Sequence, residues 1–352
     1  MPYAPESLVG IAERVERRLQ ALVEIEQARW ADLDPDLGAP MAALGRLLSS
    51  GGKRLRPAFC YWGFVGAGGD VDDERSIDAG AAFELLHAFA LLHDDVMDGS
   101  ATRRGLQTTH VSFSDEHQRE DWSGEPRRFG EGVAILVGDL AFVYADALLH
   151  GASEPAWRIW TELRIELNVG QYLDILGTAR GERRRATAER IARYKSGKYT
   201  VERPLHLGAV LAAPDRADEL LPALSAYGLP LGDAFQLRDD VLGAFGEVGL
   251  TGKPVGDDLR EGKPTSLMAV AADRAGAAHR KVLTLVGRPD LTNGQVEAIQ
   301  SVLVETGALG EVEMTIDALA SDALASLDTI DITDDARKAL TELVHYVAWR
   351  DQ

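Results

Sequence analysis

Cysteine and long apolar runs are both scarce in this sequence. Cys60 is the only cysteine among 352 residues, so an internal disulfide is excluded and a cysteine-based zinc site is disfavoured. A single cysteine also fits a reducing compartment. No stretch reaches the roughly 18 apolar residues that a membrane-spanning helix needs. Residues 1–24 are charged and amphipathic and lack the apolar core of a secretory signal. We therefore expect a cytoplasmic protein without a transmembrane segment.

Basic residues are also in short supply. The chain has 37 Lys and Arg residues against 56 Asp and Glu residues, and its formal net charge is −19. This balance argues against general nucleic-acid binding, which requires a basic face, and against adsorption to anionic membranes. Local basic islands in so acidic a chain are therefore informative.

Helical periodicity dominates the sequence, and the alternation typical of strands is hard to find. Hydrophobic residues make up 45% of the chain, enough for a large core. We predict one all-α domain over residues 1–352. The helices are expected at Leu8–Arg29, Pro40–Ser49, Arg54–Phe64, Glu74–Asp98, Gly132–His150, Ala156–Leu176, Ala186–Leu211, Ala217–Leu242, Thr265–Val286, Asn293–Val304, Leu309–Leu327 and Asp334–Trp349.

Glycine and proline mark the expected interruptions. Ser112–Gly130 is polar and is predicted to be a surface loop, and the glycine-rich stretch Gly246–Pro264 is a candidate lid over a site. Prolines inside a helix remove a hydrogen bond and clash with the preceding turn. We therefore expect kinks or breaks at Pro204, Pro222 and Pro230.

An acidic cluster ends the predicted helix Glu74–Asp98. Asp94 and Asp98 are four residues apart, so they share one helix face, and Asp95 lies beside them. Two carboxylates so placed repel each other unless a cation lies between them, and carboxylate oxygens suit Mg²⁺ alongside substrate phosphates. Arg103 and Arg104 follow with planar groups that suit phosphate oxygens. Taken alone, this motif is more often solvated surface than a metal site.

A second acidic pair strengthens the metal interpretation. Asp239 and Asp240 end another apolar helical segment, although the third position of this cluster is Gly243 and not an acid. Two acid clusters at the ends of two apolar helices can face one another across a bundle cavity, as in many helical metal sites.

Basic and polar islands complete the candidate set. Lys53 and Arg56 follow two glycines at a helix start, where backbone N–H groups favour anions. Lys195 and Lys198 flank Gly197, and Lys253 and Lys263 lie in the glycine-rich stretch. Each island alone also fits surface charge. Gln171 and Asp174 lie on an otherwise apolar helix, where a salt bridge is as plausible as a metal role. His87 also fits a hydrogen-bonded core histidine.

Taken together, these motifs resemble the trans-isoprenyl diphosphate synthase (polyprenyl synthetase) family. The resemblance runs collinearly from about Gly51 to Thr265. It rests on GGKRLRP, ELLHAFALLHDDVMDGSATRRG, GDL at Gly138–Leu140, GQYLD, YKSG, GDAFQLRDDVLG and GKPVGDDLREGKPT. It implies an isoprenoid synthase-type bundle of long helices around a central cavity, a homodimer, and three Mg²⁺ ions per active site. The implied partners are isopentenyl diphosphate and an allylic diphosphate: dimethylallyl, geranyl or farnesyl.

The resemblance also implies residue roles. Asp94 and Asp98 would bind two magnesium ions shared with the allylic diphosphate, with Asp95 in support. Asp239 would bind the third ion, with Asp240 and Asp258 acting through water. The remaining residues divide into three groups: Arg103, Lys195, Lys253 and Lys263 for the allylic diphosphate; Lys53, Arg56, His87 and Arg104 for isopentenyl diphosphate; and Gln171, Asp174 and Gln236 at the reacting centre. Two positions depart from the family pattern, Ser196 in place of a common threonine and Gly243 in place of the third acid.

The implied reaction is an ionisation, condensation and elimination. Cations aimed at the departing diphosphate stabilise the charge that develops on it, and exclusion of water protects the allylic cation. Gly197 could free a backbone carbonyl to face that cation, a hypothesis that an unbroken helix would remove. The proton is expected to leave to the released pyrophosphate.

Product length is expected to depend on the residues before the first acidic cluster. Phe89 lies five residues before Asp94, about 7.5 Å along a helix, with Ala90 beside it and Leu86 almost one turn deeper. This arrangement resembles short-chain geranylgeranyl (C20) synthases, although Phe89 could also be an ordinary core residue.

Several alternatives remain open. A farnesyl or longer polyprenyl diphosphate synthase would use the same machinery. A class I terpene cyclase shares the fold and the first acidic motif, but it needs no isopentenyl diphosphate site and has a different second motif. A head-to-head synthase is disfavoured for similar reasons. A non-catalytic subunit typically loses one aspartate cluster, whereas this chain keeps both.

Overall fold

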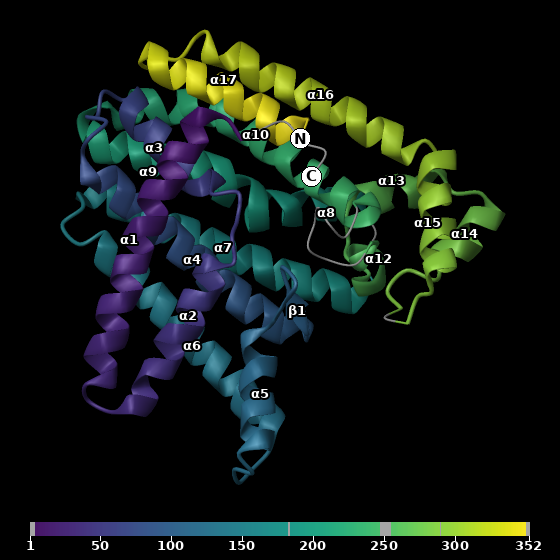
Figure 1. Ribbon diagram of the computed structural model, residues 1–352. Helices are drawn as coiled ribbons and strands as arrows, with labels where there is room; N and C mark the ends of the chain where they lie inside the picture. Colours follow the sequence, from purple (N-terminus) through teal and green to yellow (C-terminus); the bar gives the residue numbers. More distant parts are fainter. Residues whose placement is uncertain (1–3, 182–183, 247–254, 289, 350–352) are drawn as a thin grey trace. The chain divides into compact units, whose positions relative to one another are not determined.

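The computed structural model describes residues 4–181, 184–246, 255–288 and 290–349. Within these ranges the chain is almost entirely helical (Figure 1), which confirms the all-α class. The chain divides into two compact units. The N-terminal unit comprises Glu6–Tyr61 and Val71–Ala152, and the C-terminal unit comprises Trp62–Asp70 and the chain from Ser153 onward. The expectation of a single domain stays a prediction.

The N-terminal unit is built around α4 (Glu74–Asp98), which packs against α6 and α1. Asp73 caps the start of α4, because its side chain accepts a hydrogen bond from the backbone N–H of Arg75 (2.9 Å). Gly99, with φ 65°, ends it in the left-handed conformation. The other elements are α1 (Glu6–Ala31), η1 (Pro35–Leu37), α2 (Gly38–Ser49), the start of α3 (Leu55–Gly66), β1 (Thr102–Arg103), β2 (Leu106–Gln107), α5 (Thr109–Arg119) and α6 (Pro126–Leu148).

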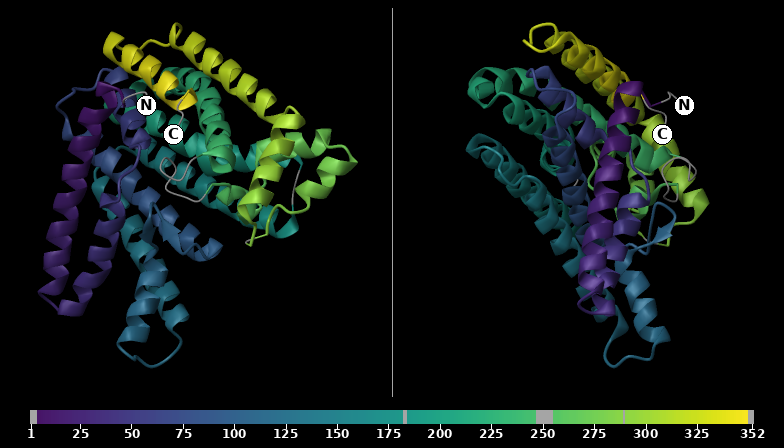
Figure 2. Two further views of the ribbon diagram at one scale, coloured as in Figure 1. Left: turned by 45° about the vertical axis from the view of Figure 1, so that its right-hand side comes forward. Right: turned by 60° about the vertical axis from the view of Figure 1, so that its left-hand side comes forward.

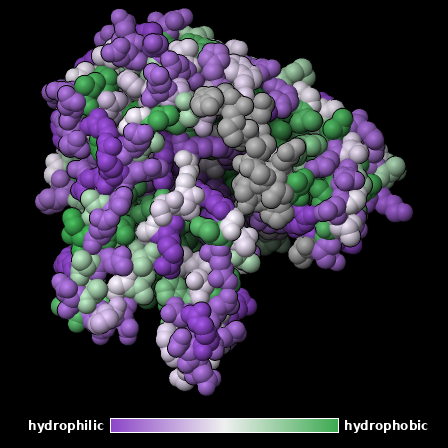
Figure 3. Space-filling model, viewed as in Figure 1, coloured by the Kyte–Doolittle hydropathy of each residue, from purple (hydrophilic) through white to green (hydrophobic). Residues whose placement is uncertain are grey.

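The prediction of a surface loop over Ser112–Gly130 was wrong. Most of this stretch is helical, because it holds the greater part of α5 and the start of α6, and the two helices lie side by side (Figure 2). The surface over α5 is largely hydrophilic (Figure 3), so its sequence resembled that of a surface loop. The buried side chains of α5 recur every three or four residues, as helix packing requires: His110, Phe113 and His117.

The C-terminal unit contains the remaining helices. Among the described residues, no helix combines the length and apolar character that a bilayer crossing requires. The elements are α7 (Glu154–Arg180), α8 (Arg185–Ala192), η2 (Arg193–Glu202), α9 (Arg203–Ala212), η3 (Pro214–Arg216), α10 (Ala217–Phe245), α12 (Asp257–Glu261), α13 (Ser266–Arg274), α14 (Ala277–Leu283), α15 (Asn293–Glu305), α16 (Ala308–Leu327) and α17 (Asp334–Ala348).

Two predicted helices of this unit are divided, and two predicted breaks, at Pro222 and Pro230, are absent. Ala186–Leu211 forms α8, the π-helical segment η2 and α9, and Thr265–Val286 forms α13 and α14. Pro204 lies in the first turn of α9, where a missing N–H costs least. In contrast, α10 continues through Pro222 and Pro230, because apolar side chains buried on both sides of each proline hold the helix in place.

Candidate functional site

The first acidic cluster occupies the last turns of α4 in the N-terminal unit. Asp94 is half-buried and Asp98 is exposed on the same helix face, whereas Asp95 is buried. Burial raises the pKa of the Asp95 carboxyl, although the neighbouring Arg103 opposes this shift. Asp94 and Asp98 are therefore the members of the cluster that can offer oxygens to a ligand.

A two-residue hairpin turn positions the arginines that follow. β1 and β2 pair in antiparallel register, and Arg104 (φ 52°) and Gly105 (φ 74°) form the left-handed turn between them. The Nε of Arg103 donates to Oδ1 of Asp95 over 2.8 Å, and its Nη2 lies 3.5 Å from Oδ2 of Asp94. The sequence pattern missed this hairpin, which fixes Arg103 against the acidic cluster.

The glycine-rich loop before α3 presents the second group of cations. Gly51 (φ 88°) and Gly52 (φ 156°) adopt conformations that favour glycine, and Arg54 follows at φ 49°. Lys53 is exposed, and Arg56 is half-buried in the first turn of α3. The helix start predicted beside these two residues is therefore confirmed.

Arg54 anchors this loop, a role that was not predicted from the sequence. Its side chain is 4% exposed and forms ion pairs with Glu84 and, over 3.1 Å, with Glu16. It also donates to the carbonyl of Leu48 over 2.6 Å. A buried arginine is stable only with such partners. Arg54 thereby holds the loop that presents the neighbouring Lys53.

The cations of this unit gather around His87. Arg104 donates to the carbonyl of Gly51 and, over 3.2 Å, to Oγ of Ser50. Burial, and then the guanidinium groups of Arg56, Arg104, Arg103 and Arg54, hold the pKa of His87 well below its usual value. The His87 ring is therefore neutral at pH 7 in a strongly positive surrounding, which suits an anion such as a diphosphate.

In the C-terminal unit, Asp174 and Lys195 form an ion pair between α7 and η2, with 2.5 Å between Oδ2 and Nζ. Gly170, one turn earlier on α7, brings the two backbones together, because a Cβ there would lie 2.5 Å from the backbone nitrogen of Lys195. Gln171 is half-buried on the same helix. The salt bridge considered for Asp174 is therefore present.

The second acidic cluster lies near the end of α10. Asp239 is half-buried and Asp240 is buried. Gln236 donates to Oδ1 of Asp240 over 2.8 Å, and the backbone N–H of Ser266 donates to Oδ2 over 3.2 Å. Burial, with smaller contributions from the charges of Asp258 and Asp239, raises the pKa of Asp240 to about 7. Asp239 is thus the more accessible carboxylate of the pair.

The missing third acid of this cluster has a structural explanation. A Cβ added at Gly243 would overlap the carboxylate of Asp258 on α12. Asp258 therefore occupies the space that a side chain at position 243 would fill. Its Oδ1 lies 3.7 Å from Nζ of Lys263, which also pairs with Glu261 over 2.7 Å. Lys253 lies outside the described residues.

The donor groups of both clusters fit magnesium. Within the described ranges, no three acidic, histidine or cysteine side chains converge on one point. Each cluster instead offers a small number of carboxylates, which suits an ion that keeps several waters and takes further ligands from substrate phosphates.

The predicted chain-length residues lie before the first acidic cluster on α4. Phe89 is half-buried, and its ring centroid lies 4.9 Å from that of Phe142 on α6 and 4.6 Å from that of His93. Leu86 is fully buried and Ala90 is half-buried. Phe142, which holds the Phe89 ring in place, was not predicted from the sequence.

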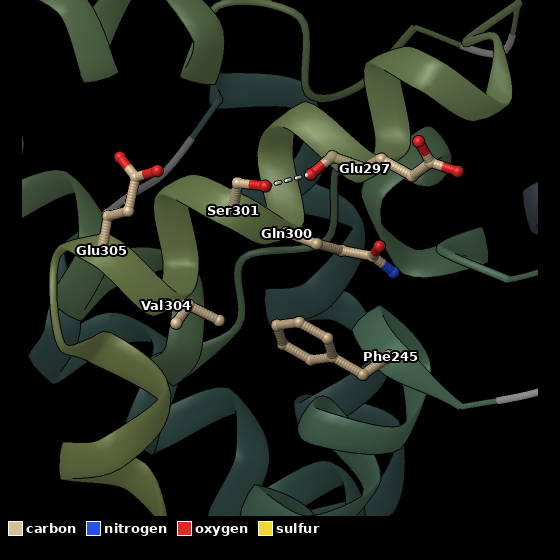
Figure 4. Close-up of a pocket in the computed structure, with 6 residues that line it drawn as sticks. All are labelled: Phe245, Glu297, Gln300, Ser301, Val304 and Glu305. Carbon is tan, nitrogen blue, oxygen red and sulfur yellow. Dashed lines mark hydrogen bonds between the residues drawn. The ribbon is translucent and has the colours of Figure 1, made fainter.

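A surface pocket between the end of α10 and α15 contains none of the predicted site residues (Figure 4). Phe245 lies against Gln300, whose side chain donates to the carbonyl of Ala244 over 2.7 Å. The other lining residues are Glu297, Ser301, Val304 and Glu305.

Comparison with known proteins agrees with this chemistry. A family model described as polyprenyl synthetase matches residues 40–303. A crystal structure of geranylgeranyl pyrophosphate synthase from Corynebacterium glutamicum, complexed with isoprenyl diphosphate and magnesium, is similar with a TM-score of 0.90. It is 37% identical, over 97% of this chain and 99% of that one. Geranylgeranyl diphosphate synthase from Mycobacterium tuberculosis is 34% identical over 286 residues (79% of this chain, 75% of the relative). Geranylfarnesyl diphosphate synthase from Aeropyrum pernix is 32% identical over 314 residues (86% and 92%).

Proposed function

The chain belongs to the polyprenyl synthetase family and is a magnesium-dependent head-to-tail prenyltransferase, and on that premise we propose that its main product is geranylgeranyl diphosphate (C20). The observation that supports this product length is the ring of Phe89 on α4, which packs at a tilt against the ring of Phe142 on α6. Two packed aromatic rings resist displacement, so they suit the wall at which a growing chain stops. The geranylgeranyl synthases among the similar proteins support the same length.

For the allylic substrate, we propose that Arg103, Lys195, Lys253 and Lys263 bind the diphosphate. Asp94 and Asp98 would hold two magnesium ions, and Asp239 would hold a third. Magnesium, when bound, neutralises charge on the departing diphosphate. Asp95 positions Arg103, and Asp240 and Asp258 support Asp239.

For isopentenyl diphosphate, we propose a pocket formed by Lys53, Arg56, His87 and Arg104. The surrounding guanidinium groups keep His87 neutral, and a bound diphosphate would offset their charge and favour the protonated ring. The alkene attacks the allylic cation, and the proton is lost to the released pyrophosphate. Gln171, Asp174 and Gln236 would line the reacting centre.

The hypothesis that Gly197 frees a carbonyl is supported by η2. The segment that contains Gly197 is π-helical and not a continuous α-helix. A π-helical turn changes the pairing of backbone carbonyls and is frequent at functional sites.

We also propose a homodimer. Apolar side chains recur on the exposed face of α6 at intervals of seven residues, at Phe129, Leu136 (63% exposed) and Val143 (60%). On α7, Ile165, Val169 and Tyr172 (64%) form a similar exposed row. Rows of this kind on a protein surface are typical of subunit interfaces. Light scattering tests the proposal. The wild type should be a dimer, and Leu136→Lys should weaken it. A monomeric wild type would contradict the proposal.

The function is tested with purified protein, isopentenyl diphosphate, Mg²⁺ and each allylic primer in turn. We expect elongation that ends at C20, identified by mass spectrometry. A C15 product, or products longer than C20, would replace the proposed chain length. No elongation with any primer would contradict the proposed substrates, and a cyclic hydrocarbon formed without isopentenyl diphosphate would identify a cyclase.

A further inference from the structure

A group of buried charges outside the proposed substrate contacts surrounds η2. This segment of 10 residues is π-helical, and the backbone N–H of Arg203 accordingly bonds to the carbonyl of Lys198, five residues earlier. Long π-helical stretches are rare and less favourable than α-helix. Such a conformation persists only where surrounding groups over-determine it, so the contacts of η2 explain its geometry.

Glycines on two neighbouring helices form a slot for η2. Besides Gly170 on α7, Gly228 and Gly232 on α10 face the segment. A Cβ at Gly228 would lie 2.9 Å from Cα of Glu202, and one at Gly232 would lie 2.5 Å from the carbonyl oxygen of Gly197. These backbones approach more closely than any side chain would permit, so η2 has little freedom to move sideways.

A second carboxylate on α7, besides Asp174, holds the C-terminal half of the segment. Glu166 is 8% exposed. It accepts hydrogen bonds from Lys198 within η2 and from Nε and Nη2 of Arg203, both over 2.7 Å, where α9 begins. Although burial favours the neutral acid, Arg203 and Lys198 hold the pKa of Glu166 below its usual value. The carboxylate is therefore charged and joined to both sides of the π-helical turn.

The spacing along α7 connects this anchor with the proposed diphosphate ligand. Glu166, Gly170 and Asp174 follow one another at intervals of four residues, so they lie on one helix face. Lys198 pairs with the first, the backbone of Lys195 packs on the second, and the ammonium of Lys195 pairs with the third. A shift of η2 along α7 would therefore displace the Lys195 ammonium.

We propose that Glu166 is a positioning residue for the prenyl transfer, because it fixes η2 on α7 and thereby places Lys195 for the allylic diphosphate. The inference rests on the proposed role of Lys195. Glu166 itself would contact no substrate. Its loss would act through η2, and the effect would fall on the allylic substrate.

The first test is Glu166→Gln, which keeps the volume but removes the charge. We expect kcat/KM for the allylic diphosphate to fall about 10- to 100-fold, because small misplacements of binding groups have effects of that size. KM for isopentenyl diphosphate should change little. Lys198→Met is the milder second variant, because it keeps the pairing of Arg203 with Glu166. It should also lower kcat/KM for the allylic diphosphate, and it replaces Glu166→Gln in the test if that variant folds poorly.

Glu311→Gln is the matched control. Glu311 also joins two cations in the same unit, Arg185 (2.6 Å) and Arg274, but has no ion pair with η2. This variant should lower the melting temperature without a selective effect on the allylic substrate. Equal kinetic effects of Glu166→Gln and Glu311→Gln would overturn the proposal.

A double-mutant cycle with Lys195→Ala separates positioning from general stability. If Glu166 acts through Lys195, Glu166→Gln should have little further effect on kcat/KM in the Lys195→Ala background. Additive effects would overturn the positioning role alone. An unchanged kcat/KM in Lys195→Ala itself would instead contradict the proposed function of Lys195, so the two failures are distinguishable.

Discussion

The imidazole of His206 on α9 predicts a specific loss of stability in acid. His206 is 3% exposed, and burial, followed by the charge of Arg203, lowers its pKa to about 3. Ser225 donates its hydroxyl to Glu202 over 2.7 Å, and the same oxygen lies 3.1 Å from Nε2 of His206. The hydroxyl oxygen is thus placed to accept a hydrogen bond from a neutral ring protonated at Nε2.

The sign and size of the effect follow from this pKa. A histidine in the unfolded chain titrates near pH 6.5, so between pH 6.5 and pH 3 the unfolded state binds a proton that the folded state does not. The contribution of neutral His206 to stability is complete above about pH 6.5 and is lost as the pH falls. At about 1.4 kcal/mol per pH unit, the loss at pH 5 is about 2 kcal/mol.

The assay is urea unfolding of the wild type and His206→Gln at pH 7.5 and pH 5. The variant should be less stable at pH 7.5, because the buried hydrogen bond is altered, but it should lose about 2 kcal/mol less than the wild type on acidification. His150→Gln, at an exposed position, serves as the control and should keep the wild-type pH dependence. An equal acid loss in His206→Gln and the wild type would refute the reasoning.

Three further changes test other parts of the site. Phe89→Ala should lengthen the product beyond C20 because it removes the ring packed against Phe142, and an unchanged product distribution by mass spectrometry would contradict this. Gly243→Ala should displace the carboxylate of Asp258, so the Mg²⁺ concentration for half-maximal activity should rise in a magnesium titration, and an unchanged titration would refute the steric argument. Arg54→Met should lower the free energy of unfolding by about 3–5 kcal/mol because it leaves Glu84 buried without its partner. It should also raise KM for isopentenyl diphosphate, and a loss below 1 kcal/mol in urea unfolding would show that Glu84 is not buried as described.

Strong periodicity and clear end signals made part of the fold predictable. The predicted bounds Glu74–Asp98 are those of α4, because an aspartate cap and a glycine frame an apolar run. The polar helix α5 was missed, because only three of its side chains are buried and its surface resembles a loop. The predicted helix Ala186–Leu211 is divided, because η2 follows the glycine slot on α7 and α10, and contacts between distant segments are not written in the local pattern.

The candidate site could be proposed from the sequence as a set of residues but not as a set of pairings. Carboxylate and lysine positions followed from spacing and from the family motifs. The anchors Arg54 and Glu166 could not be assigned that way, because their importance comes from burial and from partners far apart in the sequence, such as Glu84. The departure at Gly243 was visible in the sequence, but its cause, the carboxylate of Asp258, required the structure.

The tight hairpin after α4 also has a consequence for substrate affinity. Arg103 and Arg104 are adjacent, yet the first pairs with Asp95 and the second with Gly51 and Ser50. One rigid turn therefore joins the residues proposed for the electrophilic substrate to those proposed for the nucleophilic one. A change in the turn would displace both guanidinium groups, so under the proposed roles the affinities for the two substrates would change together.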